Sequence, residues 1–216
     1  MKILRYSERL TLPVAGEITV LLVRHGASQE DLDNQFCGWC DSPMVDFGHR
    51  QMVQVAQFLE QTKYGTIYTD DLVRTDESAK YLLSGSVSGR QVKTPLLRAW
   101  GLGSTFSGQV KSPELEAKKK YYVQHPDEMP PGIDAETLNH NKSSWMSGFT
   151  YVVSQTVPGI ASVIVCHSNG PKILSVIYQN FRLKLGHGGV MAIRIAENGV
   201  TIDVLKQGWV ENENDG

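Results

Sequence analysis

The sequence predicts an α/β protein, a three-layer α/β/α sandwich with a mostly parallel central sheet. Two runs rich in Val, Ile and Leu, at residues 17–23 and 162–166, show little of the alternation expected for a strand with one face in water. Such runs are typical of parallel strands that helices cover on both faces. Apolar residues recur at helical spacing in the segments between the two runs. We therefore expect helices on both faces of one sheet that contains these strands.

The remaining elements follow from apolar spacing and from turn residues. Gln51, Val55 and Leu59 recur at helical spacing and predict a helix over residues 46–61. The pair Asn198-Gly199 between two apolar runs is a hairpin signal. We expect further helices at 71–84, 112–124, 136–156 and 171–181, and further strands at 66–69, 92–94, 190–196 and 200–205.

Length bounds the domain organisation. A chain of 216 residues is long enough for one substantial hydrophobic core, and nothing marks an internal linker. We expect a single domain over residues 1–216, with an N-terminal extension at 1–16 and an acidic, disordered tail at 211–216. The sequence leaves the oligomeric state open.

Composition argues against nucleic acid and membranes as partners. Lys and Arg number 21 against 23 Asp and Glu, a formal charge of −2, so no overall basic footprint favours either. The basic run Lys118–Lys120 precedes two tyrosines, but acidic residues flank it, which favours a solvated helix face. No apolar run approaches the roughly 20 residues that cross a bilayer. The N-terminal residues lack an export signal, so we expect a cytoplasmic protein.

The strand at 17–23 is followed by Arg24, His25 and Gly26, and strand ends are where α/β proteins bind ligands. Arg24 can hold phosphate oxygens with its planar guanidinium, and a neutral His25 offers one ring nitrogen as a nucleophile. Gly26 lets the backbone approach a ligand closely. The second buried strand is followed by His167. The sequence therefore predicts that two strand-end histidines face one pocket.

Further segments extend this pattern along the chain. Residues 34–51 contain the run NQFCGWCDSPM before a Gly and a Gln that open a helix, and residues 68–79 place Arg74 at a helix start. The segments at 97–103 and 132–138 contribute Leu-Arg-Ala and Glu-Thr. Together with Arg24-His25-Gly26, these segments resemble the histidine phosphatase superfamily, the phosphoglycerate mutase-like proteins, over roughly residues 17–205.

The resemblance implies the chemistry as well as the fold. It implies that His25 attacks phosphorus and becomes phosphohistidine, that Arg24, Arg74 and His167 neutralise the phosphate oxygens, and that no metal or other cofactor is needed. Arg74 could instead be a surface charge at a helix start. The expected substrate is a small phosphorylated molecule. Further substrate contacts are expected from Gly26, Ser28, Asp31, Asn34, Ser168 and Asn169.

Two positions depart from the family pattern. Asp31 stands where an asparagine usually contacts phosphate, and its carboxylate would repel a dianion unless it points away or pairs with a cation. Ala99 stands where the family has a glutamate that protonates the leaving oxygen. An acid elsewhere must then supply the proton, and we expect Glu136 or Asp134, in the loop before the helix at 136–156.

Two other motifs are weaker signals. Cys37 and Cys40 have the spacing of a redox dithiol, but the next helix begins beyond Pro43 and a second cysteine pair for zinc is missing. Three cysteines are also too few for a disulfide framework. The Gly-rich run around His187 lacks the Lys and the following helix of a phosphate-binding loop, so we expect a loop at the pocket rim.

These observations favour a phosphomonoester hydrolase that acts through phosphohistidine. A mutase must retain and rebind its intermediate, and the chain lacks the larger insertions of the cofactor-dependent mutases that it resembles. Two alternatives stay open. Asp31 and Ala99 would also suit a catalytically weak phosphate-binding or regulatory member, and a phosphoglycerate mutase-like phosphotransferase would use the same histidines.

Overall fold

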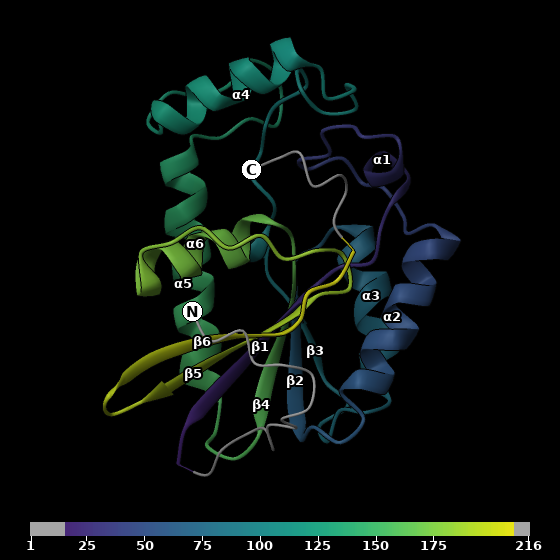
Figure 1. The fold of residues 1–216 in the computed structure, drawn as a ribbon, viewed down its shortest axis with the longest axis vertical. Helices are drawn as coiled ribbons and strands as arrows, with labels where there is room; N and C mark the ends of the chain where they lie inside the picture. The colour runs from purple at the N-terminus through teal and green to yellow at the C-terminus, as the bar shows by residue number, and fades with distance from the viewer. Residues whose placement is uncertain (1–15, 210–216) are drawn as a thin grey trace.

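Six strands form one mixed sheet in residues 16–209, the part of the chain that the computed structural model describes (Figure 1). The order is β3-β2-β4-β1-β5-β6; the first four strands pair in parallel, β5 is antiparallel to β1, and β6 is antiparallel to β5. The predicted mostly parallel sheet is thus confirmed. The strands are β1 (Ile18–Arg24), β2 (Tyr64–Thr69), β3 (Gln91–Lys93), β4 (Ala161–Cys166), β5 (Val190–Ala196) and β6 (Gly199–Lys206).

Helices cover both faces of this sheet (Figure 1). One face packs against α2 (Asp46–Phe58) and α3 (Val73–Leu83), and the other against α5 (Leu138–Gln155) and α6 (Asn169–Gln179). Alternate residues of β1 enter the two cores, because successive side chains of a strand point to opposite faces. Leu21 and Val23 belong to the first core, and Val20 and Leu22 to the second, all with 0% exposure.

A smaller layer lies beyond the carboxyl ends of the parallel strands. It contains the short helix α1 (Gln29–Leu32) and α4 (Pro113–Gln124), which Figure 1 shows at the end of the molecule away from the hairpin of β5 and β6. A separate apolar cluster supports it, formed by Phe36, Trp100, Leu102 and Phe106. This layer covers the sheet edge at which the predicted site residues emerge.

The predicted elements are present, with small differences at their ends. The helix expected from residue 171 begins at Asn169, because Pro171 lies in its first turn, where a missing N–H leaves no hydrogen bond unmade. Helix α1 and the 3₁₀ turn at Pro95–Leu97 were not predicted, since four and three residues show no periodicity. The expected extension at 1–16, apart from Gly16, and the expected tail at 211–216 lie outside the described residues. None of the described helices is long and apolar enough to span a bilayer.

Candidate active site

Parallel pairing of β1 and β4 brings His25 and His167 together. Arg24 pairs with Cys166 at the ends of these strands, and the His25 amide donates to the Cys166 carbonyl at 3.0 Å. The two imidazole rings then lie 4.9 Å apart between centroids, and each residue is 4% exposed. The predicted juxtaposition of the strand-end histidines is present.

The proton on His25 is assigned by its own turn. Nδ1 lies 2.8 Å from the Gly26 carbonyl oxygen, which can only accept, so Nδ1 carries the hydrogen. Burial and the neighbouring His167 hold the pKa of His25 well below its ordinary value. The imidazole is therefore neutral at neutral pH, and its Nε2 has a lone pair.

His167 is held by two neighbours. Its Nε2 lies 2.5 Å from Oδ2 of Asp70, and its Nδ1 accepts from Nε of Arg74 at 3.3 Å. Burial lowers the pKa of His167, although the charge of Asp70 opposes that shift. Burial alone would raise the pKa of Asp70, but the contact with His167 outweighs it, and the pKa of Asp70 is lowered. Asp70, fully buried directly after β2, was not among the predicted site residues.

Arg74 is not a surface charge. It lies in the first turn of α3, is 1% exposed, and donates from Nη1 to the Cys40 carbonyl at 2.7 Å and from Nη2 to the Gly38 carbonyl at 2.9 Å. Together with its bond to His167, these contacts use three of its five N–H groups. Two N–H groups remain for an anion. The loop of Cys37 and Cys40 thus supports Arg74 through its backbone.

His187 lies in the site and not at its rim, which corrects the sequence expectation. Its ring is 1% exposed and 5.1 Å from that of His25. Nη2 of Arg24 lies 2.6 Å from its Nε2, while Nη1 of Arg24 donates to the Leu185 carbonyl at 2.9 Å. Arginine cannot accept, so Nε2 of His187 is the acceptor and Nδ1 carries the hydrogen. Burial and the Arg24 charge lower the pKa of His187 to about 4, which agrees with a neutral ring.

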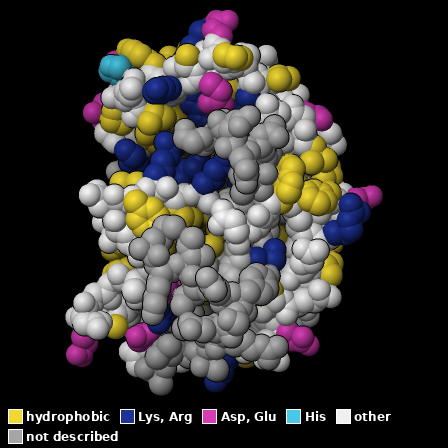
Figure 2. All heavy atoms as spheres, viewed as in Figure 1, with side chains coloured by type: hydrophobic (Ala, Val, Ile, Leu, Met, Phe, Trp, Pro, Cys, Tyr) yellow, Lys and Arg dark blue, Asp and Glu magenta, His cyan; other side chains and the backbone are white. Residues whose placement is uncertain are grey.

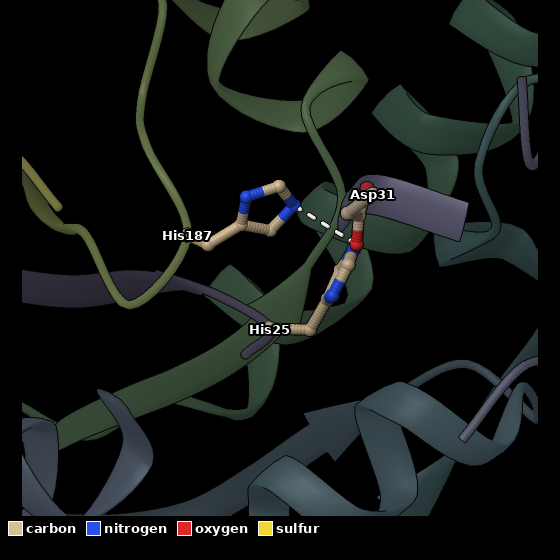
Figure 3. Close-up of side chains that lie close together, drawn as sticks. All are labelled: His25, Asp31 and His187. Carbon is tan, nitrogen blue, oxygen red and sulfur yellow. Dashed lines mark ion pairs between the residues drawn. The ribbon is translucent and has the colours of Figure 1, made fainter. Parts of the chain in front are cut away.

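Asp31 lies between these two histidines (Figure 3). Its Oδ2 is 3.2 Å from Nε2 of His187 and accepts from the Ser28 amide and hydroxyl, both at 2.9 Å. Burial favours the neutral carboxyl, but the charge of the neighbouring Arg24 opposes that effect, and the pKa of Asp31 is lowered. The predicted carboxylate therefore stays charged beside His25, held by cationic and hydroxyl neighbours.

The same three side chains include donors that metals bind. Ligand atoms of His25, Asp31 and His187 lie within 4.8 Å of one another. The Arg24 guanidinium, however, already occupies the lone pair of His187, and its positive charge opposes a cation there. With Arg74 also nearby, the arrangement suits an anion better than a divalent metal.

The other predicted contacts lie in loops and at the start of α6. A Cβ on Gly26 would lie 2.4 Å from the Gly48 carbonyl oxygen, so a side chain at this position would collide with the start of α2. Asn34 is exposed, at φ 52°, in the turn after α1. Ser168 precedes α6 at its N-cap position. Asn169 donates at 2.9 Å to both the Arg98 carbonyl and Oδ1 of Asn141, so its amide ties α6 to α5 and to the segment of Ala99.

The two predicted proton donors differ in their surroundings. Glu136 is 8% exposed, and its Oε1 accepts from the Gly101 amide and from Nδ2 of Asn141, both at 3.0 Å. Asn141 also donates to the Ala99 carbonyl at 3.3 Å, so the Glu136 carboxyl is linked to the segment that lacks the usual acid. Burial raises the pKa of Glu136. Asp134 is exposed, in the left-handed region at φ 59°.

Comparison with known proteins agrees with this geometry. A family model described as histidine phosphatase superfamily (branch 1) matches residues 20–206. A 2,3-bisphosphoglycerate-dependent phosphoglycerate mutase of Rhizobium etli is 25% identical over 186 residues, 82% of this chain and 85% of that protein. The corresponding mutase of Protochlamydia amoebophila is 26% identical, over 49% of this chain and 57% of that protein. For this relative and two further curated mutases, the match spans between 32% and 57% of their length.

Solved structures share the fold. A mycobacterial glucosyl-3-phosphoglycerate phosphatase superposes with a TM-score of 0.71 at 17% identity, over 88% of this chain and 99% of that one. A phosphoglycerate mutase of Bacillus anthracis superposes with a TM-score of 0.72 at 18% identity, over 88% of this chain and 93% of that one. The family model matches most of the chain, and the fold and the strand-end histidines agree with it. The chain belongs to the histidine phosphatase superfamily.

Proposed function

We propose that this protein is a phosphatase that hydrolyses a small phosphorylated molecule through a phosphohistidine on His25. The observation that carries the proposal is the state of His25: buried, neutral, with its proton on Nδ1 and a lone pair on Nε2. An imidazole nitrogen can attack phosphorus only when the ring is neutral and that nitrogen carries no hydrogen. The relatives named as phosphatase and as phosphoglycerate mutase support phosphoryl chemistry at such a site.

In the proposed reaction, Nε2 of His25 attacks phosphorus while the bond between phosphorus and the ester oxygen breaks, and the electron pair leaves with that oxygen. Arg24 and Arg74 stabilise the negative charge on the three non-bridging oxygens, which is most of what phosphoryl transfer asks of a protein. Water then attacks the phosphohistidine, the N–P bond breaks, and inorganic phosphate leaves. Asp70 keeps the ring of His167 oriented, and His167 in turn positions Arg74.

Glu136 is the proton donor that we favour. A donor must be protonated at working pH, and burial shifts the pKa of Glu136 upward, toward that state. Its contacts with Gly101 and Asn141 place it beside the segment of Ala99. Asp134 is exposed and is the second candidate.

A weak phosphate-binding protein is the second candidate function. The charged carboxylate of Asp31, 3.2 Å from His187 in the site, is the observation that favours it. A negative charge there reduces affinity for a dianion, and Ala99 removes the usual acid.

The two candidates are separated by turnover of an aryl phosphate and by trapping of the phosphoenzyme. We expect the wild-type protein to turn over and to yield an acid-labile phosphoprotein on rapid quenching, and His25→Ala to lose both. Inorganic phosphate binding to both proteins, measured by titration calorimetry, shows whether the pocket is intact in the variant. Turnover of His25→Ala within about tenfold of wild type would refute a phosphohistidine mechanism.

A further inference from the structure

Basic side chains gather beside the proposed active site. Figure 2 shows Lys and Arg side chains between α4 and α6 on the face that it displays. Four positively charged side chains repel the charged form of Lys172: Lys119 of α4, Arg182 and Lys184 after α6, and Arg24 of the site. The whole chain has a formal charge of −2, so this concentration of positive charge is local.

Lys172 is the central member of this basic cluster. It lies in the first turn of α6, three residues after Asn169, and within the described residues its ammonium group has no hydrogen-bond or ion-pair partner. Burial and then the neighbouring positive charges lower the pKa of Lys172 to about 7. Repulsion from these cations disfavours the charged form of the partly buried Lys172, and a bound anion would stabilise that form.

The missing acid at Ala99 points to the same ligand class. Leaving oxygens that are weak bases need little protonation, whereas an alkoxide needs much. The bridging oxygen of a phosphoanhydride leaves as part of a phosphate, which is a weak base. Such a leaving group also carries its own negative charge, which a basic cluster can stabilise.

We propose that the basic cluster around Lys172 binds the leaving phosphate of a diphosphate group, so that phosphoanhydrides are the preferred substrate class. The catalytic part of this inference rests on the proposed phosphohistidine mechanism. Nε2 of His25 attacks the terminal phosphorus, the bridging P–O bond breaks, and its electron pair stays on the oxygen of the departing phosphate. Water then hydrolyses the phosphohistidine, so that one diphosphate and one water give two phosphates.

Binding of a non-hydrolysable diphosphate analogue tests the cluster without turnover. We expect wild-type protein to bind methylenediphosphonate at least about tenfold more tightly than methylphosphonate, because a second anionic group meets the cluster. Lys172→Gln should remove most of that difference and leave methylphosphonate affinity nearly unchanged. Lys118→Gln is the matched control, since Lys118 lies on α4 but is paired with Glu114 at 2.8 Å. Equal affinities for the two ligands in wild type would overturn the proposal.

Proton uptake gives a second readout. Lys172 is only partly protonated near pH 7, and a bound anion favours its charged form, so binding should draw protons from the buffer. Calorimetry at pH 8 in two buffers of different ionisation enthalpy measures this uptake. We expect wild type to take up more protons than Lys172→Gln with the same ligand. If the variant shows the same uptake and the same preference for the diphosphonate, Lys172 is not the anion-binding group.

Turnover separates this inference from the proposed mechanism. Inorganic pyrophosphate, in the presence of a chelator, should be hydrolysed faster than an alkyl phosphate, and Lys172→Gln should lower kcat/KM for pyrophosphate more than for phenyl phosphate. Tight, Lys172-dependent binding of the diphosphonate without any turnover would support the anion site and refute the phosphatase. If the alkyl phosphate and phenyl phosphate are both hydrolysed and pyrophosphate is the poorest substrate, the phosphatase is supported and the preference for phosphoanhydrides is refuted.

Discussion

Replacing Asp31 by Asn is expected to tighten phosphate binding. The substitution removes a carboxylate whose oxygen and a His25 ring nitrogen lie within 4.8 Å of each other, and phosphorus would sit about 3–3.5 Å from the attacking nitrogen. A phosphate charge is then roughly 6 Å from the carboxylate. At an effective dielectric constant of about 20, two unit charges at that separation interact by about 2.8 kcal/mol, or about 100-fold in affinity.

The effect should be read from the dissociation constant of inorganic phosphate in wild type and Asp31→Asn, by titration calorimetry at low and high salt. An Asn oxygen can still accept from Ser28, so the turn before α1 should be retained. Asp33→Asn is the matched control, because it removes an exposed carboxylate at the other end of α1. If Asp31→Asn gains less than about threefold, or no more than Asp33→Asn, Asp31 does not face the bound phosphate.

The remaining predictions concern the other groups of the site. Arg74→Ala should weaken phosphate binding by about 1.5–3 kcal/mol. Arg90→Ala, at an exposed position, is the control and should leave the affinity unchanged. If wild type and Arg74→Ala bind phosphate equally in calorimetry, Arg74 only supports its loop. Glu136→Gln should slow alkyl phosphates about 10²- to 10⁴-fold more than aryl phosphates, and adding Ala99→Glu should restore the alkyl substrates; a loss independent of the leaving group would contradict the donor role. Lowering the pH below about 6.5 should reduce the free energy of unfolding, because the three buried histidines of the site have lowered pKa values and the unfolded chain binds protons that the native state does not. Urea denaturation at several pH values checks this, and a flat profile between pH 7 and pH 5 would refute it.

The convergence of His25 and His167 was predictable because both follow buried apolar strands. Parallel strands of one sheet end at one edge, so residues that follow them meet there whatever the loops do. Arg74 was placed by its motif at a helix start, and α3 does bring it to His167. For these three residues, local pattern and sheet geometry together determine position.

The partners of these residues were not predictable, because long-range contacts select them. Asp70 and Asp71 are adjacent and chemically identical, yet Asp70 is buried against His167 while Asp71 forms an exposed pair with Arg98 at 2.5 Å. His187 enters the site because its amide and carbonyl pair with Trp209, at 2.8 and 3.0 Å. That pairing closes a loop between segments whose sequences show no strand pattern.

Asp31 and the basic cluster around Lys172 act in the same direction on substrate choice. Asp31 lowers the positive potential where the transferred phosphoryl group binds, and the basic cluster around Lys172 raises it where a second phosphate would leave. A monoester therefore meets a weakened anion site, while a diphosphate regains the lost attraction at its other end. Asp31→Asn should then raise the affinities for methylphosphonate and methylenediphosphonate by similar factors, whereas Lys172→Gln should lower only the affinity for methylenediphosphonate. Independent sites give additive free energies in the double variant, and strong coupling between the two substitutions would mean that one phosphate contacts both residues.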